Sequence, residues 1–254
     1  MLYLIYKGGI IMPILSVIIP CYNSEEYIIE TIDSVKNQRL VDWECIIVND
    51  GSTDRSEELI MECISGDSRF RLISVENGGV GRARNIALHE SVGKYVLPLD
   101  SDDILMPDYA FNGVRFLEDN PDYSLYYGYV QYFGMGDFIE HPLWINYPNM
   151  LIQDCICVSA IYRRARGIEV GGYNESLAAM EDYDFWIRYL HHNDKVKIGR
   201  EVGFKYRNHS DSRHHSVSFE DKKMIRKEII GLNKEIYGEY RKFLGDRYCD
   251  SNGI

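Results

Sequence analysis

The sequence predicts an α/β fold in which helices cover both faces of a mostly parallel central sheet. From residue 16 onward, short apolar runs alternate with longer amphipathic segments, which is the order of β-α units. The apolar runs are continuous rather than alternating, as strands buried on both faces are. The chain has 254 residues, of which 45% are hydrophobic and 26% charged, so it can bury a large core without a disulfide or a structural metal.

Four strand-helix units are expected in the first half of the chain. Strands are expected at 16–19, 44–48, 69–75 and 94–99, and helices at about 25–37, 54–64, 80–90 and 107–118. Asn23 and Asp54 are each followed three residues later by a glutamate, Glu26 or Glu57, in the pattern of a helix cap with a reciprocal carboxylate. Each helix would therefore begin at the carboxyl end of a strand, where α/β proteins bind ligands.

The second half of the chain differs from the first in composition and periodicity. Residues 123–134 are aromatic and strand-like, whereas residues 141–149 are rich in Pro, Trp and Asn and show little periodicity. Residues 220–244 have helical composition, which predicts a terminal helix docked on the body or on a partner. No linker rich in Gly, Ser or Pro separates the two halves, so we expect one compact unit with a helical tail.

Charge and cysteine content exclude some classes of protein. The 28 Lys and Arg against 39 Asp and Glu give a net charge of −11, which argues against nucleic acid as a partner. The six cysteines show no CxxC spacing, and we interpret them as reduced thiols of a cytoplasmic protein.

The first residues form a short apolar segment. Residues 1–11 contain no acidic residue, are too short to span a bilayer and lack a cleavage site of small residues. Met12 stands directly before the first expected strand. Either Met12 is the true start and the leader before it is not native, or residues 1–12 are a disordered N-terminal extension.

An aromatic residue and a carboxylate follow the first two expected strands. Tyr22 comes directly after the first strand, where a planar group can stack on its ring, and Asp50 follows the second strand in a sharp turn. Either residue alone is typical of a turn or a cap. Together, at one edge of adjacent strands, they predict a pocket for a nucleobase.

Three aspartates follow the fourth expected strand within four residues. Asp100, Asp102 and Asp103 repel one another unless a cation or a helix dipole compensates their charge. An Asp-x-Asp pair offers the oxygen ligands that Mg²⁺ and Mn²⁺ prefer. A helix cap explains Asp103 but not Asp100 and Asp102, so the pattern favours a metal site at that pair.

A glycine-rich run, residues 77–85, lies before the third expected helix. Glycines at this position can hold a phosphate against backbone N–H groups. The dinucleotide fingerprint fails because Arg84 stands where a glycine is needed, and no P-loop motif occurs. Arg82 and Arg84 either compensate the aspartates and phosphates or lie in solvent.

Taken together, these residues resemble glycosyltransferase family 2, whose fold is known as GT-A. The resemblance is carried, in order, by residues 16–38, 44–56, 76–88, 93–108, 171–175, 180–186 and 206–209. It covers residues 14–215 and is far more specific as a set than any single block. It implies a Rossmann-like α/β/α sandwich with a C-terminal helical tail. The expected division is a donor-binding half at 13–110, an acceptor-binding half at 111–217 and a tail at 218–254.

The resemblance also implies roles for single residues. Tyr22 and Asp50 match positions that bind the donor's base, usually uracil. Asp100 and Asp102 match the metal and diphosphate motif, with Asp102 as the direct ligand. The full donor-binding set is Pro20, Tyr22, Asn23, Asp50, Asn77, Arg84, Asp100, Ser101 and Asp102.

Two further positions matter for catalysis and metal binding. Asp182 matches the catalytic base, and Glu181 beside it is expected to be a cap or structural partner. His209 matches a further metal or diphosphate contact, for which His214 or His215 could serve instead. The implied metal ligands are Asp102, Asp100 and His209.

The implied activity is inverting, metal-dependent transfer of a hexosyl or N-acetylhexosaminyl group. The donor would be a nucleoside diphosphate sugar linked to UDP. The acceptor would be a glycan or lipid-linked glycan in bacterial surface polysaccharide synthesis, and the cofactor would be Mn²⁺ or Mg²⁺. The chain has no QxxRW block and no stretch long enough for a transmembrane helix, so we expect a non-processive cytoplasmic enzyme. Peripheral contact with the inner membrane and a homodimer stay open.

Two other functions stay open at this point. A sugar nucleotidyltransferase shares the architecture but needs a glycine-rich loop with Arg or Lys after the first strand, where this chain has residues 21–24, CYNS. A non-catalytic sugar-binding or scaffold protein can keep the same fold. The intact Asp100, Asp102 and Asp182 argue against that second alternative.

Overall fold

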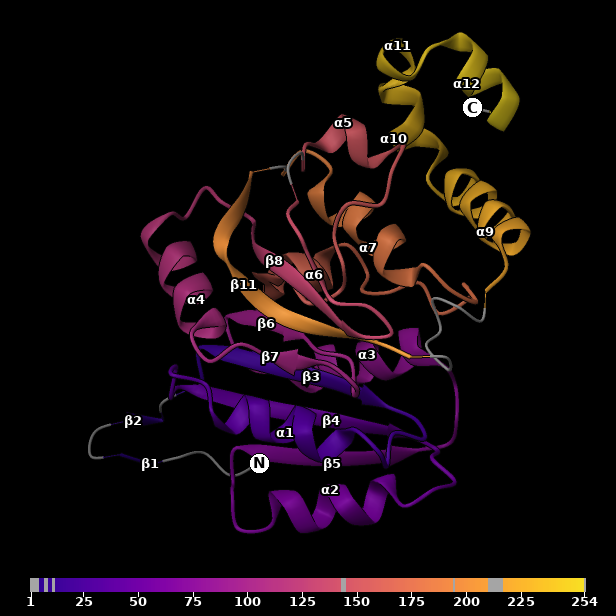
Figure 1. Cartoon of the computed structure of the whole chain (residues 1–254). Coiled ribbons are helices and arrows are strands. Elements are labelled where there is room, and N and C mark those ends of the chain that lie inside the picture. The colour runs from indigo at the N-terminus through magenta and orange to yellow at the C-terminus, as the bar shows by residue number, and fades with distance from the viewer. Residues whose placement is uncertain are drawn as a thin grey trace.

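The computed structural model describes residues 5–6, 9–10, 12–142, 145–193, 195–209 and 217–253 (Figure 1). Its strands are β1 (Ile5–Tyr6), β2 (Gly9–Ile10), β3 (Leu15–Cys21), β4 (Trp43–Asp50), β5 (Phe70–Val75), β6 (Tyr95–Pro98), β7 (Ile104–Leu105), β8 (Leu125–Gly134), β9 (Phe138–Glu140), β10 (Ile161–Arg163) and β11 (Val196–Asn208). Its helices are α1 (Ile28–Lys36), α2 (Ser56–Ile64), α3 (Val80–Glu90), α4 (Tyr109–Asp119), α5 (Tyr147–Met150), α6 (Arg164–Glu169), α7 (Glu181–Leu190), α9 (Phe219–Leu232), α10 (Lys234–Glu239), α11 (Arg241–Leu244) and α12 (Asp246–Asn252). The predicted α/β class and its four leading strand-helix units are confirmed.

One large sheet forms the centre of the molecule. Its strand order is β5-β4-β3-β6-β10-β8-β11-β7, and β9 pairs with β8 outside this path. Strands β5, β4, β3 and β6 are parallel to one another, and β8 and β11 form a second, long parallel pair. Strand β10 runs antiparallel to both β6 and β8 and so joins the two parallel regions.

Helices and loops cover the parallel strands on both faces. Every residue of β3 is buried, and because consecutive side chains point to opposite faces, neither face of this strand meets solvent. Helix α3 packs on β3 and β4, and it has the bounds that the sequence predicted. Because β3, β4 and β6 are parallel, their carboxyl ends lie at one edge of the sheet.

The helix cap predicted at Asn23 is wrong, because α1 begins only at Ile28 and the Asn23 side chain bonds to another loop. Asp54 does cap its own helix start, because its Oδ1 accepts the N–H of Ser56 at 2.9 Å, but the reciprocal bond from Glu57 is wrong, since that carboxylate bonds Asn49 and Ser74. Asn23 Oδ1 accepts the N–H of Thr53 at 2.8 Å, and Asp54 Oδ2 accepts the N–H of Glu25 at 3.0 Å. These side chains therefore tie the loop after β3 to the loop after β4.

The aromatic run forms β8 as predicted, but the tail is not one helix. Helix α9 is followed by the shorter α10, α11 and α12, which lie together beyond α7 in Figure 1. Gly245 separates the last two with a φ of 82°, a left-handed conformation that ends a helix. Ile229, Ile230 and Tyr237 are buried, so the tail is docked by an apolar face.

At the start of the chain, β1 and β2 form an antiparallel pair. Residues 1–4, 7–8 and 11 lie outside the described ones, so both explanations for residues 1–12 stay predictions. Within the described part of the chain, no helix combines the length and the apolar character that crossing a membrane requires.

Candidate functional site

A cavity of about 700 Å³, here called the strand-end cavity, opens at the carboxyl ends of β3, β4 and β6. Every residue predicted to bind the donor or the metal lines it: Pro20, Tyr22, Asn23, Asp50, Asn77, Arg84, Asp100, Ser101, Asp102 and His209. These residues lie on segments that are far apart in sequence, and the strand order brings the segments to one edge.

Asp50, at the end of β4, holds the glycine-rich run in place. Its two carboxylate oxygens accept the N–H groups of Gly78 at 2.9 Å and Gly79 at 2.8 Å. These two N–H groups therefore bond to Asp50 and do not point to a phosphate. Gly51 permits the close approach of the two loops, because a Cβ at its φ of 72° would lie 2.7 Å from the Asn77 nitrogen.

The loop after β3 presents an accessible ring on a fixed backbone. Tyr22 is 50% exposed at the cavity. Asn23 has a φ of 48°, a left-handed conformation that asparagine tolerates well. The hydroxyls of Ser24 and Ser101 lie 2.7 Å apart, which joins this loop to the turn that carries the aspartates.

Arg84 connects the aspartate turn to the start of α7. Its guanidinium lies 2.6 Å from Asp100 Oδ1 and 2.5 Å from Glu181 Oε1, and its side chain is 3% exposed. Burial alone would lower the pKa of Arg84, but Asp100 and Glu181 raise it above its ordinary value. Arg84 thus compensates the acidic groups, and Glu181 is a structural partner. Arg82 instead donates to the Glu76 carbonyl at 2.9 Å.

Asp102 and His209 form a second contact at the aspartate turn. His209 Nε2 lies 3.0 Å from Asp102 Oδ2. Burial and the charge of Asp100 raise the pKa of Asp102, and the bond with His209 opposes the rise. An imidazole nitrogen and a carboxylate oxygen side by side suit a divalent cation such as Mn²⁺. His214 and His215 lie outside the described residues.

Asp103 is not the helix cap that the sequence suggested. It is buried, and its Oδ1 accepts the N–H of Arg207 at 2.9 Å. Burial and the neighbouring aspartates raise its pKa well above the ordinary value. Arg207 Nε also donates to the Asp102 carbonyl at 2.8 Å. The end of β11 therefore fixes the aspartate turn, a role for Arg207 that sequence reasoning missed.

Sequence reasoning also missed two aromatic residues that line the strand-end cavity, Tyr27 and Tyr206. The ring of Tyr27 lies 5.0 Å from that of His209. The sequence signal for Tyr206 is its place in the block 206–209, which also contains His209. No feature of the sequence distinguishes Tyr27 from the ordinary residues that begin a helix.

Asp182 stands in the first turn of α7 and is half-buried. Over the described residues, the lining of the strand-end cavity does not include it. Its Oδ1 accepts the N–H of Tyr183 at 2.9 Å. Burial, followed by the charges of Glu181 and Asp154, raises the pKa of Asp182 to about 8, while Arg84 opposes the rise. Such a carboxylate is basic enough to take a proton near neutral pH.

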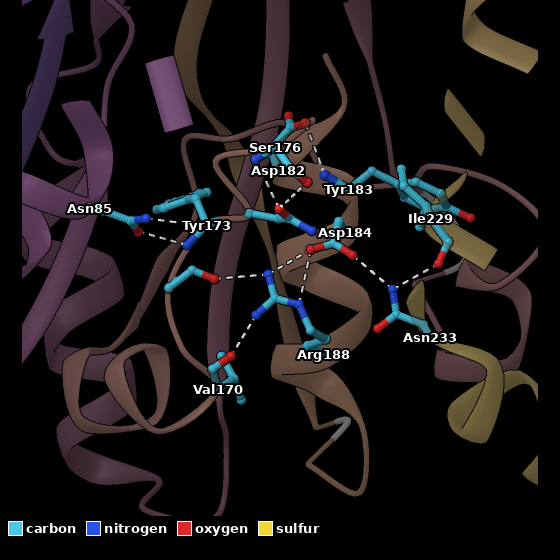
Figure 2. Close-up of polar contacts among 12 residues, drawn as sticks. Asn85, Val170, Tyr173, Ser176, Asp182, Tyr183, Asp184, Arg188, Ile229 and Asn233 are labelled. Atoms are coloured by element: carbon cyan, nitrogen blue, oxygen red, sulfur yellow. Dashed lines mark hydrogen bonds and ion pairs between the residues drawn. The ribbon is translucent and has the colours of Figure 1, made fainter. Parts of the chain in front are cut away.

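Figure 2 shows how the first turns of α7 are held. Asp184, which is buried, pairs with Arg188 at 2.6 Å and accepts a hydrogen bond from Asn233 Nδ2 at 2.7 Å. Arg188 also donates to the Gly172 carbonyl at 2.8 Å. Because Asn233 lies between α9 and α10, the tail and the segment before α7 are tied to the same part of this helix.

The model of the family described as glycosyl transferase family 2 matches residues 16–230. The chain belongs to glycosyl transferase family 2. It is therefore a glycosyltransferase, and the nucleotidyltransferase and scaffold alternatives lose their support. An uncharacterized glycosyltransferase from Methanocaldococcus jannaschii is 31% identical over 222 residues, which cover 79% of this chain and 72% of that one.

A longer relative of this family 2 chain is the chondroitin synthase of Pasteurella multocida. It is 32% identical over 184 residues, which cover 70% of this chain and 19% of the synthase. The match thus covers less than a fifth of the whole synthase.

Solved structures share the fold of this family 2 enzyme. S. aureus TarS 1–349 in complex with UDP-GlcNAc superposes with a TM-score of 0.72 at 24% identity, covering 85% of this chain and 65% of that chain. The mannosyltransferase PcManGT from Pyrobaculum calidifontis, in complex with GDP-Man and Mn²⁺, gives 0.63 at 18% identity, covering 86% and 62%. The expected GT-A fold is confirmed.

Proposed function

We propose that this family 2 enzyme transfers a sugar from a UDP-linked donor to a glycan or lipid-linked glycan, with inversion and with Mn²⁺ or Mg²⁺ as cofactor. The supporting observation is the strand-end cavity, where an accessible tyrosine, a buried aspartate and an aspartate-histidine pair face one space. Residues 13–110 would bind the donor and residues 111–217 the acceptor. The UDP-GlcNAc complex of TarS, which shares the fold, supports the donor class.

The donor's base would lie on Tyr22. Its exposed ring offers a stacking surface, and its loop is held by the bonds to neighbouring loops. Asp50 accepts two backbone N–H groups, and a carboxylate can accept about four hydrogen bonds, so it keeps capacity for the N–H of a uracil. Stacking and this one acceptor would favour a base with a ring N–H, such as uracil, over cytosine and adenine, whose corresponding ring nitrogens are acceptors.

The residues of the aspartate turn fit a divalent cation. Asp102 and His209 would hold it, with Asp100 beside them and fixed by Arg84. A bound cation would offset the charge of the diphosphate as its bond to the sugar breaks. The Mn²⁺ complex of PcManGT, which shares the fold, supports this assignment.

Asp182 would take the proton of the acceptor hydroxyl. The hydroxyl oxygen forms a bond to the anomeric carbon while the bond from that carbon to the diphosphate oxygen breaks on the opposite face. One displacement of this kind inverts the configuration. A pKa of about 8 suits the role, because it leaves the carboxylate a strong enough base to receive a hydroxyl proton.

The acceptor would enter beside α7. A second cavity of about 460 Å³ is lined by residues that include Glu140, His141 and Asp154, and the charge of Asp154 acts on Asp182. We assign the acceptor to this cavity. The chondroitin synthase relative supports a polysaccharide product, and we assign this enzyme to bacterial surface polysaccharide synthesis at the cytoplasmic face of the membrane.

Calorimetric titration of nucleotides tests the donor site. UDP, GDP, CDP and dTDP are titrated into the protein with Mn²⁺ or Mg²⁺, and then with a chelator. UDP is expected to bind selectively and to require both the cation and Asp102, so that Asp102→Asn loses binding. Asp108→Asn, which removes an exposed aspartate a few residues further on, is the matched control and is expected to bind as the wild type does. Absence of binding by every nucleotide would contradict the proposal.

A further inference from the structure

Two histidines and a glutamate converge where α7 meets the C-terminal tail. His191 and His192 directly follow α7, and Glu239 is the last residue of α10. His191 Nε2 lies 2.9 Å from Glu239 Oε2, and His192 Nε2 lies 3.3 Å from the same oxygen. One ligand atom from each of the three residues lies within 4.8 Å of the other two. This cluster is separate from the two cavities described above.

The distances resemble those between ligands of a tetrahedral metal ion. Zinc lies about 2.0–2.2 Å from imidazole nitrogens and carboxylate oxygens, so two of its ligands are about 3.3 Å apart. The contact of His192 with Glu239 has this length, and that of His191 is slightly shorter. We propose that His191, His192 and Glu239 form a binding site for a divalent transition metal, zinc above all, that links the tail to α7.

The local geometry prepares the three groups for an ion. His192 has a φ of 58°, which is uncommon for a residue other than glycine, and its ring centroid lies 3.8 Å from that of His191. The side chains of His192 and Glu239 are 68% and 46% exposed, so an ion can enter and water can complete its coordination.

The balance of ligand types differs from that of the aspartate turn, where two carboxylates, Asp100 and Asp102, accompany the single imidazole of His209. Imidazole suits zinc, cobalt, nickel and copper, whereas Mn²⁺ and Mg²⁺ favour carboxylate, phosphate and water oxygens. Two imidazoles and one carboxylate therefore favour zinc. The metal at this cluster would differ from the cation that assists transfer.

The position of the cluster gives the ion a structural effect. The tail is already attached near the start of α7, where Asn233 donates to Asp184 at 2.7 Å and Arg226 donates to the Tyr183 hydroxyl at 3.1 Å. An ion at the cluster would attach the tail at the other end of the same helix. Bound zinc is therefore expected to stabilise the docked tail.

Zinc titration of the metal-stripped Asp102→Asn protein tests the proposal, because this background breaks the Asp102–His209 pair of the strand-end cavity. Calorimetry is expected to show one zinc ion bound per chain, and zinc is expected to raise Tm. Glu239→Gln and His192→Ala in this background are expected to weaken zinc binding by at least about tenfold and to abolish the rise in Tm. Glu235→Gln, an exposed position on the same helix, is the matched control and is expected to keep both.

Two outcomes would overturn the proposal. One is equal zinc affinity in Glu239→Gln, His192→Ala and the Glu235→Gln control, and the other is no zinc binding in the Asp102→Asn background. Because His192 is mostly exposed, its replacement leaves the core intact, and circular dichroism confirms that the variant is folded. Absorption by bound Co²⁺ then reports the coordination of the site directly: the tetrahedral spectrum is expected in the background and its loss in both ligand variants.

Discussion

The donor half of this molecule and the helix that carries Asp182 are held in place in different ways. Most side chains of the strand-end cavity belong to residues 13–110, where they follow neighbouring parallel strands and are fixed by bonds between adjacent loops. Tyr206 and His209 join them from the end of β11. Helix α7 instead depends on distant partners: Glu181 pairs with Arg84, 97 residues away, and Asp184 with the tail, 49 residues away. The order of strands determines the first site, whereas long-range polar contacts determine the second.

Substitution of Asp182 is expected to have the largest effect on activity and tests this difference between the two regions. Asp182→Asn keeps the shape of the side chain but removes the proton acceptor, so sugar transfer is expected to fall by about 10²–10⁴-fold. Affinity for UDP is expected to stay unchanged, because the donor half does not use this residue. Steady-state transfer and calorimetric UDP binding are measured on the same protein. Asp122→Asn, an exposed aspartate paired with Lys195, is the control.

Asp182 loses the assigned role if the Asp182→Asn protein transfers sugar as fast as the control does. A fall in UDP affinity along with transfer would instead indicate that the two halves share this residue. The two measurements therefore distinguish a failure of the base from a failure of the donor site.

Arg84 is the point where the two regions meet, and its removal is expected to have the largest effect on stability. Arg84→Met leaves Glu181 buried and Asp100 partly buried without their cation, which typically costs about 3–5 kcal/mol in the free energy of unfolding. Urea denaturation measures the change. Arg82→Met, two residues earlier, removes only a contact with a backbone carbonyl and is expected to cost less than about 1 kcal/mol. Equal losses in the two variants would contradict the bridging role of Arg84.

The sequence predicts the donor half well because its information is local. Continuous apolar runs reveal the buried strands, and polar residues directly after them must share one edge in a parallel sheet. Tyr22, Asp50, Asp100 and Asp102 all follow such strands, and they line one cavity. Predicted contacts of single residues are wrong where a second loop offers another hydrogen-bond partner. The amide oxygen of Asn23, for example, bonds to the loop after β4 instead of to its own helix.

The second half is less predictable because its contacts skip long stretches of sequence. Arg207 lies in the block 206–209, but the spacing of that block does not show that its backbone and guanidinium hold the aspartate turn from the end of β11. The composition of the tail predicts one helix, but the chain turns between α9, α10 and α11, and Gly245 separates α11 from α12. Spacing within a segment does not reveal which distant surface that segment will meet.

Asn233 tests whether the tail contributes to the region of Asp182. Asn233→Ala removes a hydrogen bond to the buried carboxylate of Asp184, and is expected to lower the free energy of unfolding by about 1–3 kcal/mol. Because α7 is then less firmly held, kcat is expected to fall while UDP affinity stays unchanged. Asn252→Ala, which removes a bond to the Tyr248 carbonyl near the end of the chain, is the control. An Asn233→Ala protein as stable and active as this control would separate the tail from the site.

The pH dependence of transfer gives the smallest but most specific prediction. With a pKa of about 8, about a tenth of Asp182 is ionised at pH 7 and most of it at pH 9. Because the ionised form accepts the proton, kcat/KM is expected to rise about tenfold between these pH values. Glu181 and Asp154 face this carboxylate and raise its pKa, and Arg84 lowers it.

The cause of this pKa can be tested one charge at a time. Asp154→Asn removes a negative charge that disfavours ionisation of Asp182, so the midpoint of the pH profile is expected to move to lower pH and the rate at pH 7 to rise. Asp137→Asn, which removes an aspartate bonded to Gln131 at the surface, is expected to leave the midpoint where it was. A profile that is flat between pH 6 and 9, or one that Asp154→Asn does not move, would show that the surroundings of α7 do not control the base. A shift limited to Asp154→Asn would show that contacts in the second half control the proton step, while the donor half supplies the nucleotide site.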